Sequence, residues 1–168
     1  EITEGDWSSD VCSSDLLELL AAQPEVSVPA DPTPLPAKAS GALVFDDVNF
    51  RYPSRPDTPA LANFSLTVSP GESVALVGPS GAGKTTVFQL LLRFYDPQSG
   101  QLRLDGIPIS SADPLAVRRC IALVPQEAVI FASSVLENVR YARPDASADD
   151  VRAACIAAHA DDFVSQLP

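Results

Sequence analysis

From residue 42 onward, hydrophobic and polar positions alternate in short runs, and these runs predict a series of strands and helices. We expect strands over Ala42–Phe50, Phe64–Val68, Ser73–Val77, Gln101–Leu104 and Ile121–Val124. The first strand carries a predicted irregularity at Asp46–Asp47, and the last is apolar throughout and is therefore expected to be buried. Tight turns at Ser69–Glu72, 97–100 and 105–106 separate these runs.

Helices are predicted between and after the strands. Val87, Leu90, Leu91 and Phe94 recur at helical spacing, so residues 86–94 are expected to form a helix whose apolar stripe packs on the sheet. Three further helices are expected: from an Asp113 cap and Pro114 to about Arg119, over 133–141, and from Ser147 to about Ala160. This alternation predicts an α/β fold with a parallel sheet, preceded by an antiparallel β portion.

Composition narrows the possible classes of protein. The 168 residues suffice for one ordinary domain, and a net charge of −11 argues against a nucleic-acid partner. No apolar run approaches the length of a membrane span. The cysteines have neither metal-ligand spacing nor a paired framework, which suits a reducing cytosol, and Cys120 and Cys155 are expected to be small core residues.

The first forty residues are interpreted as lying outside the domain. Residues 1–16 contain a near-repeat of Ser-Ser-Asp, and Asp10–Leu16 can be encoded by a sequence resembling a common sequencing adapter. We therefore interpret 1–16 as a non-native, adapter-like segment; it holds five acidic residues and no basic ones, so without it the charge is −6. Residues 17–40 are expected to be a helical stub and an unpacked, proline-rich linker, with the domain over 41–168.

A glycine-rich loop follows the strand predicted over Ser73–Val77. It reads Gly78, four residues, Gly83, Lys84 and Thr85, which is the complete phosphate-binding pattern. Glycines let backbone N–H groups curl around phosphates, Lys84 would reach the β- and γ-phosphates, and the Thr85 hydroxyl would bind Mg²⁺. The alternative, a glycine-rich turn with no ligand, leaves the lysine unexplained, although the chain has only two, Lys38 and Lys84.

Two further features point to one family of phosphate-loop proteins. Tyr52 follows the first strand in Asn-Phe-Arg-Tyr-Pro, and Gln126 follows the last predicted strand in Leu-Val-Pro-Gln-Glu. With Asp96-Pro97 and Leu104-Asp105-Gly106, these segments resemble the nucleotide-binding domain of ATP-binding-cassette (ABC) transporters of the exporter type. The resemblance implies a phosphate-loop NTPase fold, here an amino-proximal fragment truncated within the helical subdomain.

The resemblance also implies an ATP site with Mg²⁺. Its nucleotide-binding residues would be Tyr52, Gly78, Ser80, Gly81, Ala82, Gly83, Lys84, Thr85 and Thr86. Tyr52 would stack on adenine, Thr86 would contact the α-phosphate, and Thr85 and Gln126 would be the metal ligands. Lys84 and Gln126 would be the catalytic residues, with Gln126 approaching the γ-phosphate.

The implied partners are a membrane domain of the same polypeptide and a second cassette arranged head to tail, at the cytoplasmic face of a membrane (the inner one in a bacterium). The family also needs a Leu-Ser-Gly-Gly-Gln signature, an Asp-Glu strand end and a switch histidine, which this sequence lacks; His159 is expected to be a surface residue. We therefore expect the chain to bind ATP without hydrolysing it, whereas the intact protein would be an ATPase. The alternatives are a non-catalytic nucleotide-binding interaction module and, ranked last, a small-molecule kinase or GTPase.

Overall fold

The computed structural model describes residue 20, residues 26–127 and residues 129–167. The adapter-like segment 1–16 and Cys12 lie outside the described residues, as does the helical stub except for residue 20. The chain divides into two units, Glu1–Ala122 and Leu123–Pro168. In neither unit does a described helix combine the length and apolar character that crossing a membrane requires.

The first unit contains a four-stranded antiparallel sheet in the order β2-β1-β3-β4. Its strands are β1 (Leu43–Phe50), β2 (Leu61–Val68), β3 (Ser99–Leu104) and β4 (Ile107–Pro108). Leu43 pairs with Val68 on one side and with Leu104 on the other. The antiparallel portion predicted before the phosphate loop is therefore confirmed for β1 and β2. The prediction of a parallel sheet is wrong for the described residues, because β3, which follows the loop, pairs antiparallel with β1 and every other described strand pair is antiparallel too.

The predicted irregularity at Asp46–Asp47 is also confirmed. The β1–β2 register shifts between Phe45 and Val48, and Asp47 has a φ of 48°. Gly100 is what lets β3 approach this bulge, since a Cβ at that position would lie 2.3 Å from the Asp47 carbonyl oxygen.

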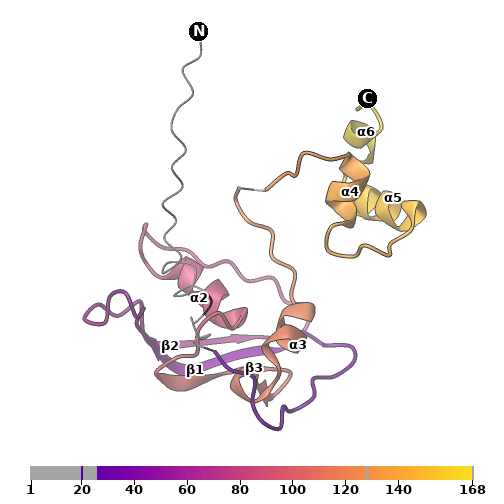
Figure 1. Cartoon of the computed structure of the whole chain (residues 1–168). Helices are drawn as coiled ribbons and strands as arrows, with labels where there is room; N and C mark the ends of the chain where they lie inside the picture. Colours follow the sequence, from indigo (N-terminus) through magenta and orange to yellow (C-terminus); the bar gives the residue numbers. More distant parts are fainter. Residues whose placement is uncertain (1–19, 21–25, 128, 168) are drawn as a thin grey trace. The chain divides into compact units, whose positions relative to one another are not determined.

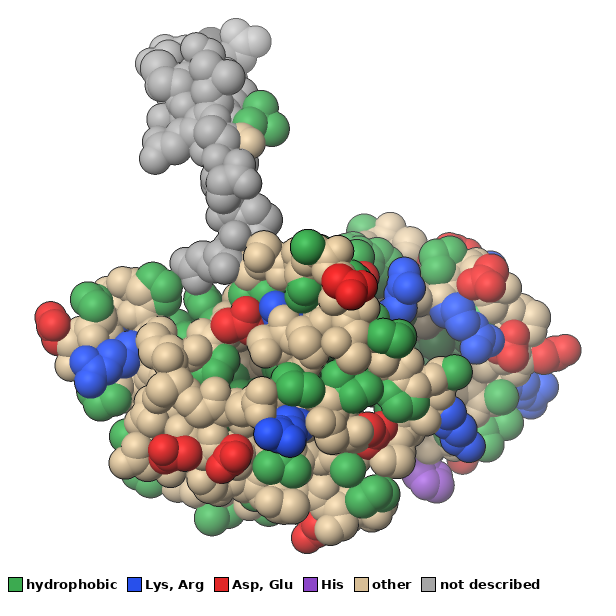
Figure 2. Space-filling view, turned by 90° about the horizontal axis from the view of Figure 1, so that it is seen from below, with side chains coloured by type: hydrophobic (Ala, Val, Ile, Leu, Met, Phe, Trp, Pro, Cys, Tyr) green, Lys and Arg blue, Asp and Glu red, His purple; other side chains and the backbone are tan. Residues whose placement is uncertain are grey.

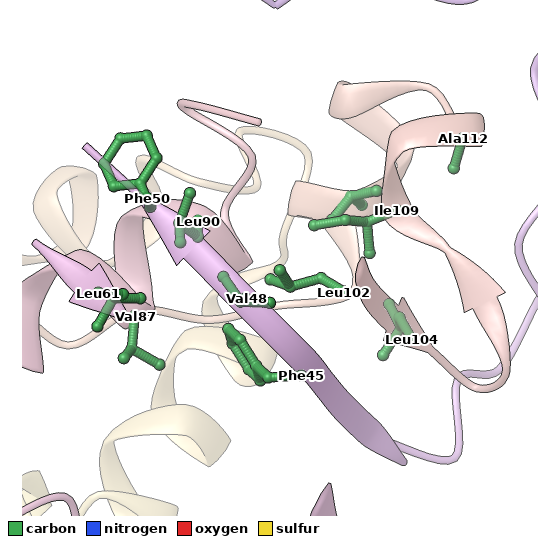
Figure 3. Packing of buried hydrophobic residues seen from close by; sticks show 11 residues of the cluster. Phe45, Val48, Phe50, Leu61, Val87, Leu90, Leu102, Leu104, Ile109 and Ala112 are labelled. Carbon is green, nitrogen blue, oxygen red and sulfur yellow. The ribbon is translucent and has the colours of Figure 1, made fainter. Parts of the chain in front are cut away.

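One face of this sheet is covered by α2 (Lys84–Leu91), with α3 (Pro114–Arg119) beside it, as Figure 1 shows. A 3₁₀ turn, η1 (Ile109–Ser111), precedes α3. Val87 and Leu90 of α2 meet apolar side chains of the sheet, a packing drawn in Figure 3. The core residues are Phe45, Val48, Phe50, Leu61, Val87, Leu90, Leu102, Leu104, Ile109, Ala112 and Val117. The predicted stripe packs on the sheet through Val87 and Leu90, and Leu91 is partly buried against the core. Phe94 is 48% exposed, contrary to prediction, because α2 ends at Leu91 rather than at residue 94. Asp113 caps α3 by accepting from the Leu115 N–H at 2.9 Å.

The prediction of strands at 73–77 and 121–124 is wrong. Neither segment is a strand, Val77 is 89% exposed and Val124 is 91% exposed. A parallel strand is held by hydrogen bonds to neighbours on its two sides and by elements covering both faces. No strand among the described residues pairs with either segment, so their apolar sequence alone does not make them strands.

The proline-rich segment 26–40 is extended, as predicted, but it makes specific contacts with the first unit. The Thr33 N–H donates to the Ser111 carbonyl at 2.7 Å, and Leu35 packs against the core. At its end, the Ser40 hydroxyl and backbone N–H both donate to the Asp105 carboxylate. The expectation of an unpacked linker is therefore corrected. These hydrogen bonds connect the segment to turns that lie far away in the sequence, so the contacts could not be predicted from the segment itself.

The second unit is helical. It contains α4 (Val135–Arg140), α5 (Ala148–Ala157) and α6 (Asp161–Val164), of which α6 was not separately predicted. Ser134 caps α4, and Ser147 and Asp150 form a capping box at the start of α5.

The outcomes for the cysteines and the histidine differ. Cys155 of α5 is buried and His159 is exposed, as predicted. Cys120 is exposed, contrary to prediction, because it lies at the C-terminal cap of α3 rather than in a buried strand.

Candidate nucleotide-binding site

The glycine-rich loop leads directly into the N-terminus of α2. Gly83 is the N-cap residue with a φ of 83°, and the Val87 N–H donates to its carbonyl at 3.1 Å. The N–H groups of Lys84, Thr85 and Thr86 precede this first helical bond, so they remain available to a ligand. Together with the positive end of the helix dipole they favour an anion in front of the helix.

Gly83 also lies close to the start of β2. A Cβ there would lie 2.6 Å from the Ala60 carbonyl oxygen and 2.9 Å from a Leu61 side-chain carbon. Only glycine permits both this contact and the left-handed backbone, which explains in physical terms why this position of the pattern is a glycine.

Lys84 turns back toward the loop that precedes it. Its Nζ donates to the carbonyl oxygens of Gly78 and Pro79, each at 2.8 Å. These two bonds keep the ammonium group at the loop, where a phosphate bound by the loop would meet it. The side chain therefore both stabilises the loop conformation and supplies a positive charge.

Tyr52 is fixed at the edge of the core by contacts of both its ring and its hydroxyl group. The ring packs edge-on against Phe50 and Tyr95, with centroid distances of 4.9 and 5.4 Å. Its hydroxyl lies 3.0 Å from the Thr86 hydroxyl and 3.3 Å from the Gln89 side-chain oxygen. Thr86 is buried, so the Tyr52 hydroxyl ties the β1–β2 loop to the first turn of α2.

A cavity of about 440 Å³ lies between these elements. Its lining consists of Tyr52, Arg55, Thr58, Pro59, Ala60, Ser80, Gly81, Ala82, Gly83, Lys84, Thr85 and Thr86. It therefore brings together the predicted nucleotide-binding residues except Gly78, whose carbonyl accepts from Lys84. Gln126 is an exposed residue of the second unit, and its role as a metal ligand and catalytic residue stays a prediction.

Sequence reasoning missed one wall of this cavity. Arg55 and the segment Thr58–Ala60 belong to the loop between β1 and β2, which was predicted only as a loop. The sequence feature that points to Arg55 and Thr58–Ala60 as cavity residues is weak, because it consists of their closeness in sequence to Tyr52.

The lining is positively charged, with Arg55 and Lys84 and no acidic side chain, in a chain whose net charge is −11. An anionic ligand in the cavity therefore meets two positively charged side chains, although the net charge of the chain is negative. Thr85 is exposed at the wall, and its hydroxyl is the kind of oxygen donor that Mg²⁺ accepts alongside phosphate oxygens and water. The donor set therefore fits a magnesium–nucleotide complex.

Comparison with known proteins assigns the family. Residues 61–167 match the family model described as ABC transporter. The chain belongs to the ABC transporter family. The matched range contains the whole phosphate loop and Gln126, whereas Tyr52 precedes it.

Relatives and solved structures agree with this assignment. The ABC chain is 48% identical over 134 residues to the ATP-dependent lipid A-core flippase of Thiobacillus denitrificans, covering 79% of this chain and 23% of the flippase. It is 47% identical over 133 residues to ABC transporter B family member 3 of Dictyostelium discoideum, covering 79% of this chain and 9% of the relative.

A bacterial Atm1-family ABC exporter, solved with ATP bound, superposes with a TM-score of 0.83 at 36% identity. The match covers 93% of this chain and 27% of the exporter chain. The chain therefore carries part of an ABC exporter nucleotide-binding domain and spans about a quarter or less of the length of these relatives.

Proposed function

We propose that this chain is the ATP-binding part of an exporter in which ATP hydrolysis drives transport of a substrate across a membrane. The observation that carries the proposal is the cavity that joins Tyr52 to the phosphate loop and the first turn of α2. Family membership supports ATP as its ligand, and the lipid A-core flippase and the Atm1-family exporter support export as the activity.

In the proposed complex, the N–H groups at the start of α2 and the Lys84 ammonium bind the phosphates. Tyr52 stacks on the adenine, because an aromatic ring offers a flat π face to a base. Thr85, with Gln126, would hold the Mg²⁺ ion, which supplies charge neutralisation at the phosphate oxygens. Holding Lys84 in place beforehand means that little reorganisation accompanies phosphate binding.

The proposed partners are a membrane domain of the same polypeptide and a second cassette in a head-to-tail dimer, at the cytoplasmic face of a membrane. On the face shown in Figure 2, Lys and Arg side chains lie among Asp and Glu side chains rather than in one continuous basic patch. That nucleic acid is not a partner stays a prediction.

The test of ATP binding exploits the two lysines of the chain. Equilibrium dialysis with ATP and Mg²⁺ should detect binding to the wild-type chain and its loss in Lys84→Ala, which removes the charge at the phosphates. Lys38→Ala is the matched control, because Lys38 is exposed and lies outside the cavity. Equal ATP binding by Lys84→Ala and the wild type would contradict the proposal.

Two further measurements refine the assignment. Tyr52→Ala should weaken ATP binding by about 1–3 kcal/mol, the usual value of a base–aromatic stack. An unchanged dissociation constant would remove the adenine contact. In a complete cassette that carries this sequence, Lys84→Ala should abolish ATP turnover; a complete cassette that binds ATP but never hydrolyses it would favour the non-catalytic module.

A further inference from the structure

The cavity contains a second positive charge that no motif assigns. Arg55 lies three residues after Tyr52, in the loop between β1 and β2, and lines the same cavity as the phosphate loop. The ion pairs among the described residues involve Arg93, Arg140, Arg143 and Arg152, and not Arg55. Its guanidinium group is therefore not committed to a carboxylate of the described chain.

The loop that carries Arg55 is held in a defined shape by its own hydrogen bonds. The Arg55 N–H donates to the Tyr52 carbonyl at 2.9 Å, and the Thr58 N–H donates to the Arg55 carbonyl at 3.2 Å. The neighbouring Arg51 side chain donates to the Pro56 carbonyl at 3.1 Å. Arg51 thus stabilises the loop, while the loop presents Arg55 at the cavity wall.

The two cations of the cavity are in different situations. Lys84 already donates to two backbone carbonyls, whereas Arg55 offers a planar fork of N–H donors that pairs well with phosphate oxygens. Since no acidic side chain lines the cavity, the fork has no competing anion there. A polyphosphate bound at the start of α2 would bring anionic oxygens into the same cavity.

We propose that Arg55 is a further nucleotide-binding residue that contacts the phosphate chain of ATP from the β1–β2 loop. This inference rests on the proposed function and deepens it. Arg55 and Lys84 then bind the phosphates from two segments of the cavity lining, the β1–β2 loop and the start of α2. Arg55 acts as an electrostatic clamp on the ligand, while Tyr52 next to it in the same loop binds the base.

The experiment compares ATP with adenosine, which shares the base and ribose but has no phosphate. Arg55→Gln should weaken ATP binding about tenfold, the loss typical of one charged hydrogen-bonding contact, and leave adenosine binding within about twofold. Arg55→Lys should recover part of the ATP affinity. Arg103→Gln is the matched control, because it removes the same charge from an exposed position of β3 outside the cavity.

Salt dependence provides a second readout. ATP affinity should fall less steeply with ionic strength in Arg55→Gln than in the wild type and in Arg103→Gln, because one screened charge interaction is gone. Unchanged ATP binding in Arg55→Gln, or equal losses for ATP and adenosine, would overturn the phosphate contact while leaving the proposed function intact. A wild-type chain that binds no ATP at all would overturn the proposed function itself.

Discussion

Arg93 provides the strongest test of how the phosphate-loop helix is held in place. It lies just beyond the C-terminal end of α2, and only 3% of its surface is exposed. Its guanidinium donates to both oxygens of Asp96, at 3.0 and 3.2 Å, and to the carbonyl of the fully buried Ala112. It therefore connects the end of α2 to the turn before α3.

The cost of Arg93→Ala can be estimated contact by contact. Removing the donor leaves the buried Ala112 carbonyl unsatisfied, which costs about 1–3 kcal/mol. Asp96 is 38% exposed, so solvent screens the ion pair, and its loss adds only about 0.5–1 kcal/mol. We therefore expect Arg93→Ala to lower the free energy of unfolding by about 3 kcal/mol.

The assay is urea denaturation followed by far-UV circular dichroism. Arg103→Ala is the control, because Arg103 is exposed on β3, and it should change the unfolding free energy by less than about 0.5 kcal/mol. Arg93→Lys should rescue only partly, since one ammonium group cannot reproduce the forked contacts. If Arg93→Ala proved no more destabilising than Arg103→Ala, the network would not hold α2 as described.

Two other predictions concern the loops. Gly83→Ala should destabilise the chain by more than Gly106→Ala. Both glycines have φ near +80°, so both substitutions carry a left-handed strain of about 1–2 kcal/mol, but of the two only Gly83 would place its Cβ within 4 Å of another backbone segment. Equal losses of unfolding free energy in urea denaturation would refute the close approach. Hydrogen bonds, chiefly from the Ser40 side chain, lower the pKa of Asp105 from its usual 3.8. The ionised Asp105 carboxylate therefore stabilises the fold above pH 3.8, and this contribution is lost as the pH falls through the folded-state pKa. The difference in unfolding free energy between wild type and Asp105→Asn should shrink over that pH range. A difference that stays constant with pH would contradict this prediction.

Much of the candidate site could be predicted because its signals are local. The spacing of Gly78, Gly83, Lys84 and Thr85 is a property of adjacent residues, and the cavity contains the loop from Ser80 to Thr86. Arg55 could not be assigned, since its place in the cavity depends on two turns in its loop and on the packing of that loop against α2.

By itself, the sequence determined the family, the phosphate loop, the antiparallel strands and the helix caps, because each depends on neighbouring residues or on short-period patterning. Tertiary structure decided what depends on distant partners. The apolar segments 73–77 and 121–124 are not strands, since strand formation needs hydrogen-bonding neighbours that no local pattern supplies. The linker contacts the cassette because tertiary structure supplies a distant partner for it. Ser40 and Asp105 are far apart in the chain and are brought together by the pairing of β1 with β3.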